Sequence, residues 1–310
     1  DVKQKAPNYH NFNFIYEKVN SSEIFFKVGN HKLKEPIIFP PDKMIYINGS
    51  TTFDMSVNSY IYSKSPFTMK GTIDNPIQFF SSDTSGGGIL IDRAKAESFF
   101  ENVHFFNIGR EVEKYLGTTG SVSLYESQAF IKNCKFYNNF SEDALNIVRS
   151  TFNISNTSFS NNLHDALDVD YCAGEINNSF FFFSGNDAID ISGSKINLKQ
   201  IEIHYSDDKG ISVGESSYLN AQNIKIHNSN IGIASKDLSN VQIQDLEIRK
   251  SEIGLAVFQK KPEFGPANIN ITKGTLYSCN VDYVLEDRSS LTFNNEKLED
   301  TIINANSLIY

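Results

Sequence analysis

A five-residue pattern recurs in this sequence every 22 residues, and it limits the possible folds more than any other feature does. Its third and fifth residues are aliphatic in nearly every copy, and polar or small residues alternate with them. Six copies begin at Asp143, Asp165, Asp187, Lys209, Ile231 and Ile253. An apolar residue at every second position is typical of a strand that buries one face.

A second strand recurs with the same period. Its buried positions are Phe136, Phe159, Phe181, Ile203, Ile226 and Ile248. An amide column precedes it, formed by Asn133, Asn156, Asn178, Gln200, Asn223 and, last, Asp245. Asparagine is favoured in tight turns, and stacked amides can hydrogen-bond along a column. Short strands at a fixed period predict coils that stack on one another, so we expect an all-β, right-handed parallel β-helix of about 22 residues per coil.

The repeat predicts one domain over residues 1–310. We expect an N-terminal cap over residues 1–36, coils over residues 37–290 and a C-terminal cap over residues 291–310. Insertions near residues 109–119 and 260–266 interrupt the period. In a solenoid such insertions form loops on one face and often wall a groove.

Charge and hydropathy exclude several kinds of partner. The formal net charge is −9 and no dense basic stretch occurs, which argues against nucleic acid and anionic membrane surfaces. No apolar run is long enough to span a bilayer. We expect a secreted or cell-surface protein whose signal peptide has been removed. The sequence does not specify an oligomeric state.

The residues between the buried positions predict a polar outer face. If Leu145, Leu167 and Ile189 point inward, their neighbours point outward in columns. The first outward column contains Asn146, Asp168, Asp190 and Ser212, and the second contains Tyr125, Val148, Asp170, Ser192 and Gly214. Glu126, Arg149, Tyr171 and Glu215 follow at the ends of these strands, and Asp165, Asp187 and Lys209 stand at their beginnings.

Stacked carboxylates at ~4.8 Å must bind a metal, share a proton or be screened by solvent. Asp165, Asp168, Asp187 and Asp190 are candidate ligands for a hard cation, and Ca²⁺ suits them best. Alternatively, these aspartates only accept hydrogen bonds from turn N–H groups. A ligand site is favoured because the acids occupy three successive coils and are then replaced by Ala234 and Ala256.

Residues 87–266 resemble known β-helix repeats. The resemblance rests on NCKFYNNFSEDALNIVRS, DALDVDYCAGEINN, NDAIDISGSKI, DKGISVGESS and NIGIASKDLSNV. They are similar to the β-helix region that follows a spore-coat-H-like kinase domain in bacterial surface proteins, and to β-helix repeats of carbohydrate-binding and sugar-hydrolase proteins. The motifs of polygalacturonases are absent except for Asp207-Asp208, and those of mannuronan epimerases are missing.

Three functions therefore remain open. The first is a polysaccharide lyase or glycoside hydrolase acting on an acidic glycan. Its candidate catalytic residues are Asp168, Asp190, Lys209, Arg149 and Tyr171, and its candidate substrate-binding residues are Tyr125, Glu126, Asn146, Asp170, Ser212 and Glu215. In the lyase scheme Lys209 is the base, and Tyr171 or Arg149 lies near the leaving group. The second function is a non-catalytic carbohydrate-binding or adhesion module, and the third is a structural spacer.

Overall fold

The computed structural model describes residues 2–110 and 112–309, in which almost all regular structure is β-strand. The chain divides into two compact units, residues 1–166 and 167–310, and the boundary falls within β19 (Asp165–Asp170). In each unit the chain coils as a parallel β-solenoid, so the predicted fold class is confirmed. The assignment of residues 1–310 to one domain stays a prediction.

The described residues of unit 1 form two sheets, almost wholly parallel, and three short helices. Its first sheet comprises β4 (Ile37–Phe39), β7 (Ile61–Ser63), β10 (Ile89–Asp92), β13 (Gly120–Tyr125) and β16 (Asp143–Val148). Its second sheet comprises β1 (Ile15–Glu17), β2 (Glu23–Phe26), β3 (Gly29–Leu33), β5 (Met44–Asn48), β6 (Thr51–Met55), β8 (Phe67–Lys70), β9 (Ile77–Phe80), β11 (Ser98–Glu101), β12 (Val103–Phe106), β14 (Ala129–Lys132), β15 (Lys135–Tyr137), β17 (Thr151–Ser155) and β18 (Ser158–Asn162). The helices are η1 (Val2–Gln4), η2 (Tyr9–Asn11) and α1 (Val112–Leu116).

The coils of unit 1 begin within the segment that the sequence assigns to a cap. Strand β2 pairs in parallel with β5, and β3 pairs in parallel with β6. Only β1 runs antiparallel, and it pairs with β2. The parallel ladder therefore starts by Glu23.

A column of stacked phenylalanine rings fills the interior of unit 1. The centroid distances are 4.7 Å for Phe53–Phe79, 5.3 Å for Phe79–Phe105, 4.9 Å for Phe105–Phe136 and 4.9 Å for Phe136–Phe159. All five rings are fully buried. Their spacing follows that of neighbouring strands, ~4.8 Å, because the parallel register places the same position of each coil beside the next.

The insertion near residues 109–119 forms α1, which covers part of the outer face of the first sheet in unit 1. Its Val112 and Leu116 pack with Tyr62, Leu90 and, from η1, Val2. The N-terminal segment thus covers a sheet face as well as preceding the first coil.

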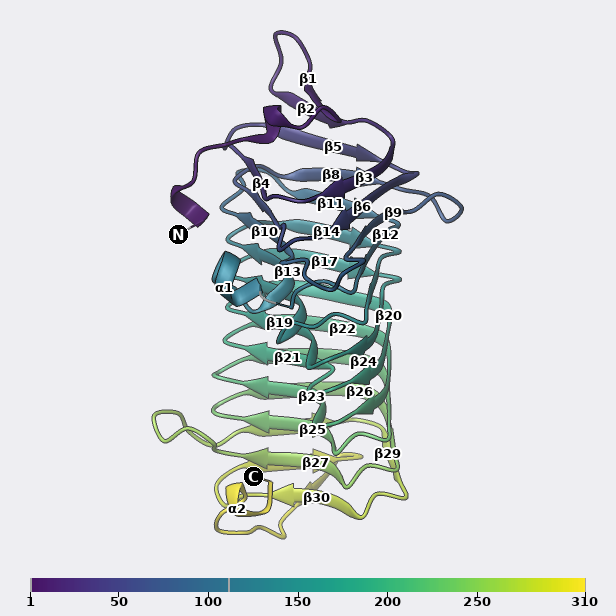
Figure 1. The fold of residues 1–310 in the computed structure, drawn as a ribbon. Coiled ribbons are helices and arrows are strands. Elements are labelled where there is room, and N and C mark those ends of the chain that lie inside the picture. Colours follow the sequence, from purple (N-terminus) through teal and green to yellow (C-terminus); the bar gives the residue numbers. More distant parts are fainter. Residues whose placement is uncertain (1, 111, 310) are drawn as a thin grey trace. The chain divides into compact units, whose positions relative to one another are not determined.

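Unit 2 repeats the same arrangement with longer strands (Figure 1). Its first sheet comprises β19, β21 (Ile189–Ser192), β23 (Lys209–Gly214), β25 (Ile231–Lys236), β27 (Ile253–Phe258) and β30 (Val281–Leu285). Its second sheet comprises β20 (Ala173–Ser184), β22 (Lys195–Ser206), β24 (Tyr218–His227), β26 (Asn240–Arg249), β28 (Asn268–Ile271), β29 (Gly274–Tyr277), β31 (Ser290–Phe293) and β32 (Glu296–Leu298). The chain ends at the short helix α2 (Asn306–Ile309).

The aliphatic column predicted from the repeat is buried in both units. Leu145 of unit 1 and the five residues of unit 2, Leu167, Ile189, Ile211, Ile233 and Leu255, are all 0% exposed. The predicted inward direction of this column is therefore confirmed.

The amide column marks a sharp turn within each coil. In unit 2 its members have positive φ angles: 49° at Asn178, 55° at Gln200, 57° at Asn223 and 60° at Asp245. This left-handed conformation is costly for most residues, but asparagine and aspartate adopt it more readily. The turn explains the amide column, and it bends β20, β22, β24 and β26 in their middles.

A serine ladder lines another corner of unit 2. The Ser194 hydroxyl accepts a hydrogen bond from the Cys172 N–H at 2.7 Å, and the Ser217 hydroxyl accepts one from the Ser194 N–H at 3.0 Å. The Ser239 hydroxyl likewise accepts one from the Ser217 N–H at 3.2 Å. Each buried hydroxyl thus accepts a hydrogen bond from a backbone N–H of the preceding coil. Leaving such an N–H buried without an acceptor would cost about 1–3 kcal/mol.

The C-terminal segment covers part of the outer face of the first sheet in unit 2. Ala305, Ile302 and Ile309 pack against a cluster that contains Ala234 and Ala256, and both alanines are 0% exposed. The small residues are therefore packing positions. The remaining outer face, over β19, β21 and β23, carries the aspartates.

Replacing Ile189 by alanine should lower the free energy of unfolding by about 2–5 kcal/mol, because the truncated side chain leaves a cavity in the buried column. Urea unfolding would measure the loss. Ile303→Ala is a matched control, because Ile303 is 95% exposed and the change should alter stability by less than about 0.5 kcal/mol. Equal losses in the two variants would contradict the assigned register.

Candidate functional site

The outer face of β19, β21 and β23 gathers the polar residues that the sequence predicts in unit 2. Asp168 is in register with Asp190, and Asp190 is in register with Ser212. The two aspartates are partly exposed, whereas Ser212 is fully buried. We use the name acidic cluster for Asp168, Asp170, Asp187, Asp190 and Glu215.

Asp187 forms the buried base of this cluster with Lys209. Both residues are 3% exposed, and the Lys209 Nζ lies 3.6 Å from the Asp187 Oδ1. The same Asp187 oxygen accepts a hydrogen bond from the Lys209 N–H at 2.8 Å, and Lys209 also pairs with Asp208. Burial raises the pKa of Asp187, and the charges of Asp190 and Asp208 act in the same direction, while Lys209 opposes them. This ion pair is closed off from solvent, so it holds the site together from beneath.

Asp170 is the carboxyl group best suited to keep a proton. Burial raises its pKa to about 6, and the negative charges of Asp190 and Glu215 add to the effect. Lys261 opposes the rise, and it also forms an ion pair with Glu215. A carboxyl group of this kind donates a proton at mildly acidic pH, which most surface aspartates cannot do.

Lys236 completes the cluster, and the sequence prediction missed it. Its Nζ donates a hydrogen bond to the Ser212 hydroxyl at 2.8 Å. Its alkyl chain crosses Gly214, where an added Cβ would lie 2.8 Å from the Lys236 Cε. Lys236 continues the second outward column one coil beyond Gly214, so extending the 22-residue period by one step would have found it.

The insertion at residues 260–266 is bound to the exit of the same strands. The Asp237 Oδ1 accepts hydrogen bonds from the N–H groups of Lys260 and Lys261, both at 2.7 Å. The Leu238 N–H donates to the Gly265 carbonyl oxygen at 2.9 Å. The loop therefore brings Lys261 to Glu215, which the sequence prediction left without a cationic neighbour.

Tyr171 presents an exposed ring at the exit of β19. It adopts a left-handed backbone conformation with φ of 54°, and its side chain is 57% exposed. The ring lies over Gly193, where an added Cβ would be 2.6 Å from the Tyr171 Cδ1. Gly193 and Glu215 are also left-handed at this corner, with φ of 60° and 58°, so the conformation belongs to the turn and leaves the ring on the surface.

The predicted residues of unit 1 form their own group. The Arg149 Nη1 donates a hydrogen bond to the Tyr125 hydroxyl at 2.9 Å and lies 3.9 Å from Glu126. Arg93, which the sequence prediction did not select, pairs with Glu126 at 3.2 Å and lies 5.1 Å from the Tyr125 ring centroid. Asn146 is only 4% exposed, which leaves little of it for a ligand.

The predicted metal ligands and the predicted catalytic base, Lys209, lie in the following surroundings. The four proposed metal ligands are divided between the units, with Asp165 in unit 1 and the other three in unit 2. The metal set stays a prediction. Lys209 is buried in ion pairs with Asp187 and Asp208, so it lacks the exposure that a catalytic base needs.

Asp170→Asn should stabilise the protein more as the pH rises from about 4 to about 6. The folded protein binds the Asp170 proton more tightly than the unfolded chain does, so wild type loses stability over this interval as Asp170 ionises. Asparagine does not ionise, and the difference in Tm between variant and wild type should therefore grow and then level off. Thermal unfolding across pH measures it, with Asp207→Asn as an exposed control. A difference that is constant with pH would contradict the assignment.

Known proteins share this architecture. A mutant of the periplasmic alginate epimerase AlgG has a TM-score of 0.56 at 12% identity, covering 90% of this chain and 78% of that one. The catalytic domain of a GH87 α-1,3-glucanase mutant, in complex with tetrasaccharides, has a TM-score of 0.53 at 12% identity, covering 91% and 64%. At such identities the likeness shows the fold.

A search of curated proteins finds no match. None of the helices in the described part of the chain has the length and apolar character needed to cross a membrane. Residues 143–298, half of the chain, match the model of a family described as the right-handed β-helix region. The protein therefore belongs to the right-handed β-helix family.

Proposed function

We propose that the acidic cluster binds a polysaccharide and hydrolyses it, with Asp170 as the general acid and Asp190 as its partner. A glycoside hydrolase needs one carboxyl group that keeps its proton and a second one across the scissile bond. Asp170 has a pKa of about 6, and Asp190 is near enough for its charge to contribute to that rise. The partial burial of Asp170 beside the carboxyl group of Asp190, which raises the pKa of Asp170, is the observation that carries the proposal.

The structural neighbours support a polymeric sugar as the substrate. The alginate epimerase and the α-1,3-glucanase are polysaccharide enzymes on this fold, and one was solved with tetrasaccharides. Outward residues of successive coils repeat every ~4.8 Å, so they present a linear array to an extended chain. The exposed ring of Tyr171, at the exit of β19, offers a flat apolar surface to a sugar ring.

The charges of the acidic cluster favour a substrate with little negative charge. Each nearby lysine already has a polar partner: Lys209 pairs with Asp187, Lys236 bonds Ser212, and Lys261 pairs with Glu215. A uronate chain would meet the carboxylates directly unless a cation bridged them. We therefore favour a neutral glycan over the acidic one that the sequence suggests, and Lys209 has no part in the reaction scheme.

Asp190→Asn should lower the hydrolysis rate by a factor of about 10² or more, because it removes a carboxyl group that acts in the transition state. The measurement is the release of reducing ends from α-1,3-glucan, dextran, alginate and polygalacturonate, together with the ultraviolet absorbance of an unsaturated product. Asp207→Asn is the matched control and should keep full activity.

The outcomes separate the candidate functions. An ultraviolet-absorbing product would indicate a lyase and contradict hydrolysis. Retention of a polymer without turnover would identify a binding module. Full activity in both Asp170→Asn and Asp190→Asn would show that the reaction takes place elsewhere.

The second candidate is binding of an acidic glycan through Ca²⁺, and the stacked carboxylates favour it. Hard oxygen ligands suit this cation, but six to eight are needed, so water or a substrate carboxylate must complete the shell. The ammonium group of Lys209 already neutralises part of the charge on Asp187.

If Ca²⁺ binds, millimolar Ca²⁺ should raise the Tm and give heat in calorimetric titration, because binding to the folded state stabilises it. Asp190→Asn should reduce both effects. A Tm that Ca²⁺ does not change, with or without alginate, would remove this candidate and leave hydrolysis of a neutral glycan untouched.

A further inference from the structure

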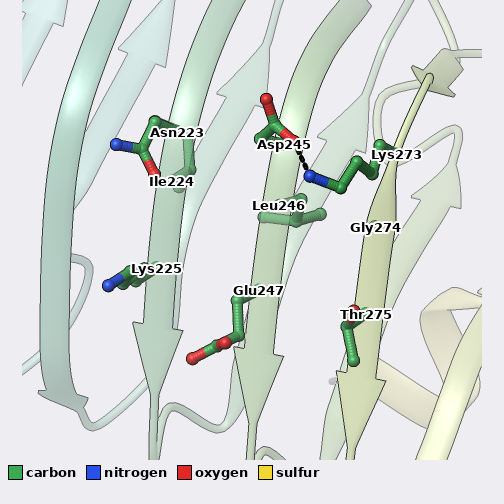
Figure 2. A pocket seen from close by; sticks show the side chains of 9 residues that line it. All are labelled: Asn223, Ile224, Lys225, Asp245, Leu246, Glu247, Lys273, Gly274 and Thr275. Atoms are coloured by element: carbon green, nitrogen blue, oxygen red, sulfur yellow. Dashed lines mark hydrogen bonds and ion pairs between the residues drawn. The ribbon is translucent and has the colours of Figure 1, made fainter.

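A polar groove follows the bend of the second sheet in unit 2, on strands other than those of the acidic cluster. One pocket of about 360 Å³ is lined by residues of β24, β26 and β29 together with Lys273 (Figure 2). A second pocket, of about 210 Å³, is lined by residues of β20, β22 and β24. Both are lined by Asn223 and Lys225, so they are two parts of one trough, which we call the bend groove.

The groove is built from two rows of side chains, each with one member per coil. The first row consists of the turn residues Asn178, Gln200, Asn223 and Asp245, whose left-handed conformation bends the strands. The second row lies two residues further along each strand and consists of Phe180, Glu202, Lys225, Glu247 and Thr275, which are in register. Because each coil adds one residue to each row, the groove repeats every ~4.8 Å.

The charges of the groove nearly cancel, because two lysines and three acidic residues line it. Lys225 stands in register between Glu202 and Glu247. Glu202 bonds His204 at 2.7 Å, and Glu247 bonds Arg249 at 2.8 Å, which helps to lower the pKa of Glu247 to about 2. Asp245 and Lys273 pair at 2.7 Å, as the dashed line in Figure 2 marks. A polyanion or polycation gains little here, whereas a ligand with many hydroxyl groups meets amides and charged groups that can donate and accept hydrogen bonds.

An aromatic ring stands at the β20 end of the second row. Phe180 is 42% exposed although it lies in a row of polar residues, and its ring stacks on Phe182 at 6.3 Å. An exposed ring beside hydrogen-bonding side chains suits the mixed surface of a pyranose, which has an apolar C–H face and polar edges. A peptide strand is a poorer fit, because strand addition needs a free sheet edge and this groove lies on a sheet face.

We infer that the bend groove is a second glycan-binding site, which holds a neutral polysaccharide strand along the stacked coils without cleaving it. It uses residues outside the acidic cluster, so it can hold a polymer whether or not that cluster is catalytic. Phe180 supports one sugar ring, and Lys225, two strands further along, binds the hydroxyl groups of another sugar together with the neighbouring amides.

Affinity electrophoresis of the full chain in gels that contain dextran, pullulan or soluble laminarin tests this inference, with alginate as the charged comparison. At least one neutral polymer should retard the wild type more than alginate does. Phe180→Ala should weaken the apparent affinity about threefold to tenfold, the loss expected for one stacked ring. The double variant Phe180→Ala/Lys225→Ala should bind more weakly than Phe180→Ala alone.

Two controls make the result specific. Tyr218→Ala removes a ring that is 41% exposed on the same sheet but lies outside the groove, and it should not change the retardation. In the Asp190→Asn background, which alters the acidic cluster alone, Phe180→Ala should weaken the retardation by the same factor as in wild type. No retardation by any neutral polymer, equal retardation of Phe180→Ala and wild type, or an equal loss in Tyr218→Ala would overturn the inference. If the effect of Phe180→Ala disappeared in the Asp190→Asn background, the binding would belong to the acidic cluster and the inference would be overturned too.

Discussion

The parallel hydrogen-bonded register between successive coils governs the rest of this structure. It places each residue beside the residue one repeat later, so one kind of side chain forms a column. Inside, the columns are stacked phenylalanine rings and aliphatic side chains that are fully buried. Outside, the same rule stacks carboxylates as readily as alanines, and like charges at strand spacing repel. The acidic cluster therefore exists against an electrostatic cost, which the buried ion pair of Asp187 and Lys209 reduces.

The periodic part of the fold was predictable from the sequence, because alternation and period are properties of the chain itself. The buried positions of Leu167 and Ile189 and the register of Asp168 with Asp190 all follow from counting. The segments that cover the outer faces of the sheets could not be predicted in the same way. Packing of Ala305 on the column of Ala234 and Ala256 joins segments far apart in the sequence, and no period links them.

The candidate site was predicted in its aspartates but not in its cations. Lys236 lies one repeat beyond Gly214 in the second outward column, so the period could have identified it. Lys261 lies in an insertion that does not follow the repeat. The raised pKa of Asp170 could not be predicted from the sequence either, because it depends on burial and on two neighbouring acids. The bend groove was missed because its amide column was interpreted only as a turn. The turn is also where the two pockets of the groove lie.

The left-handed corners also allow the coils to differ in length while their strands stay paired. Paired residues of β21 and β23 are 22 apart, as in Ile189 and Ile211, whereas those of β22 and β24 are 23 apart, as in Ile201 and Ile224, so the turn between β23 and β24 holds one extra residue. A corner can thus take in an extra residue without disturbing the columns. The protein can be lengthened by whole coils, each adding ~4.8 Å to every outer trough. Duplication of one repeat would lengthen a glycan-binding surface by one coil and leave the side chains of the other coils unchanged.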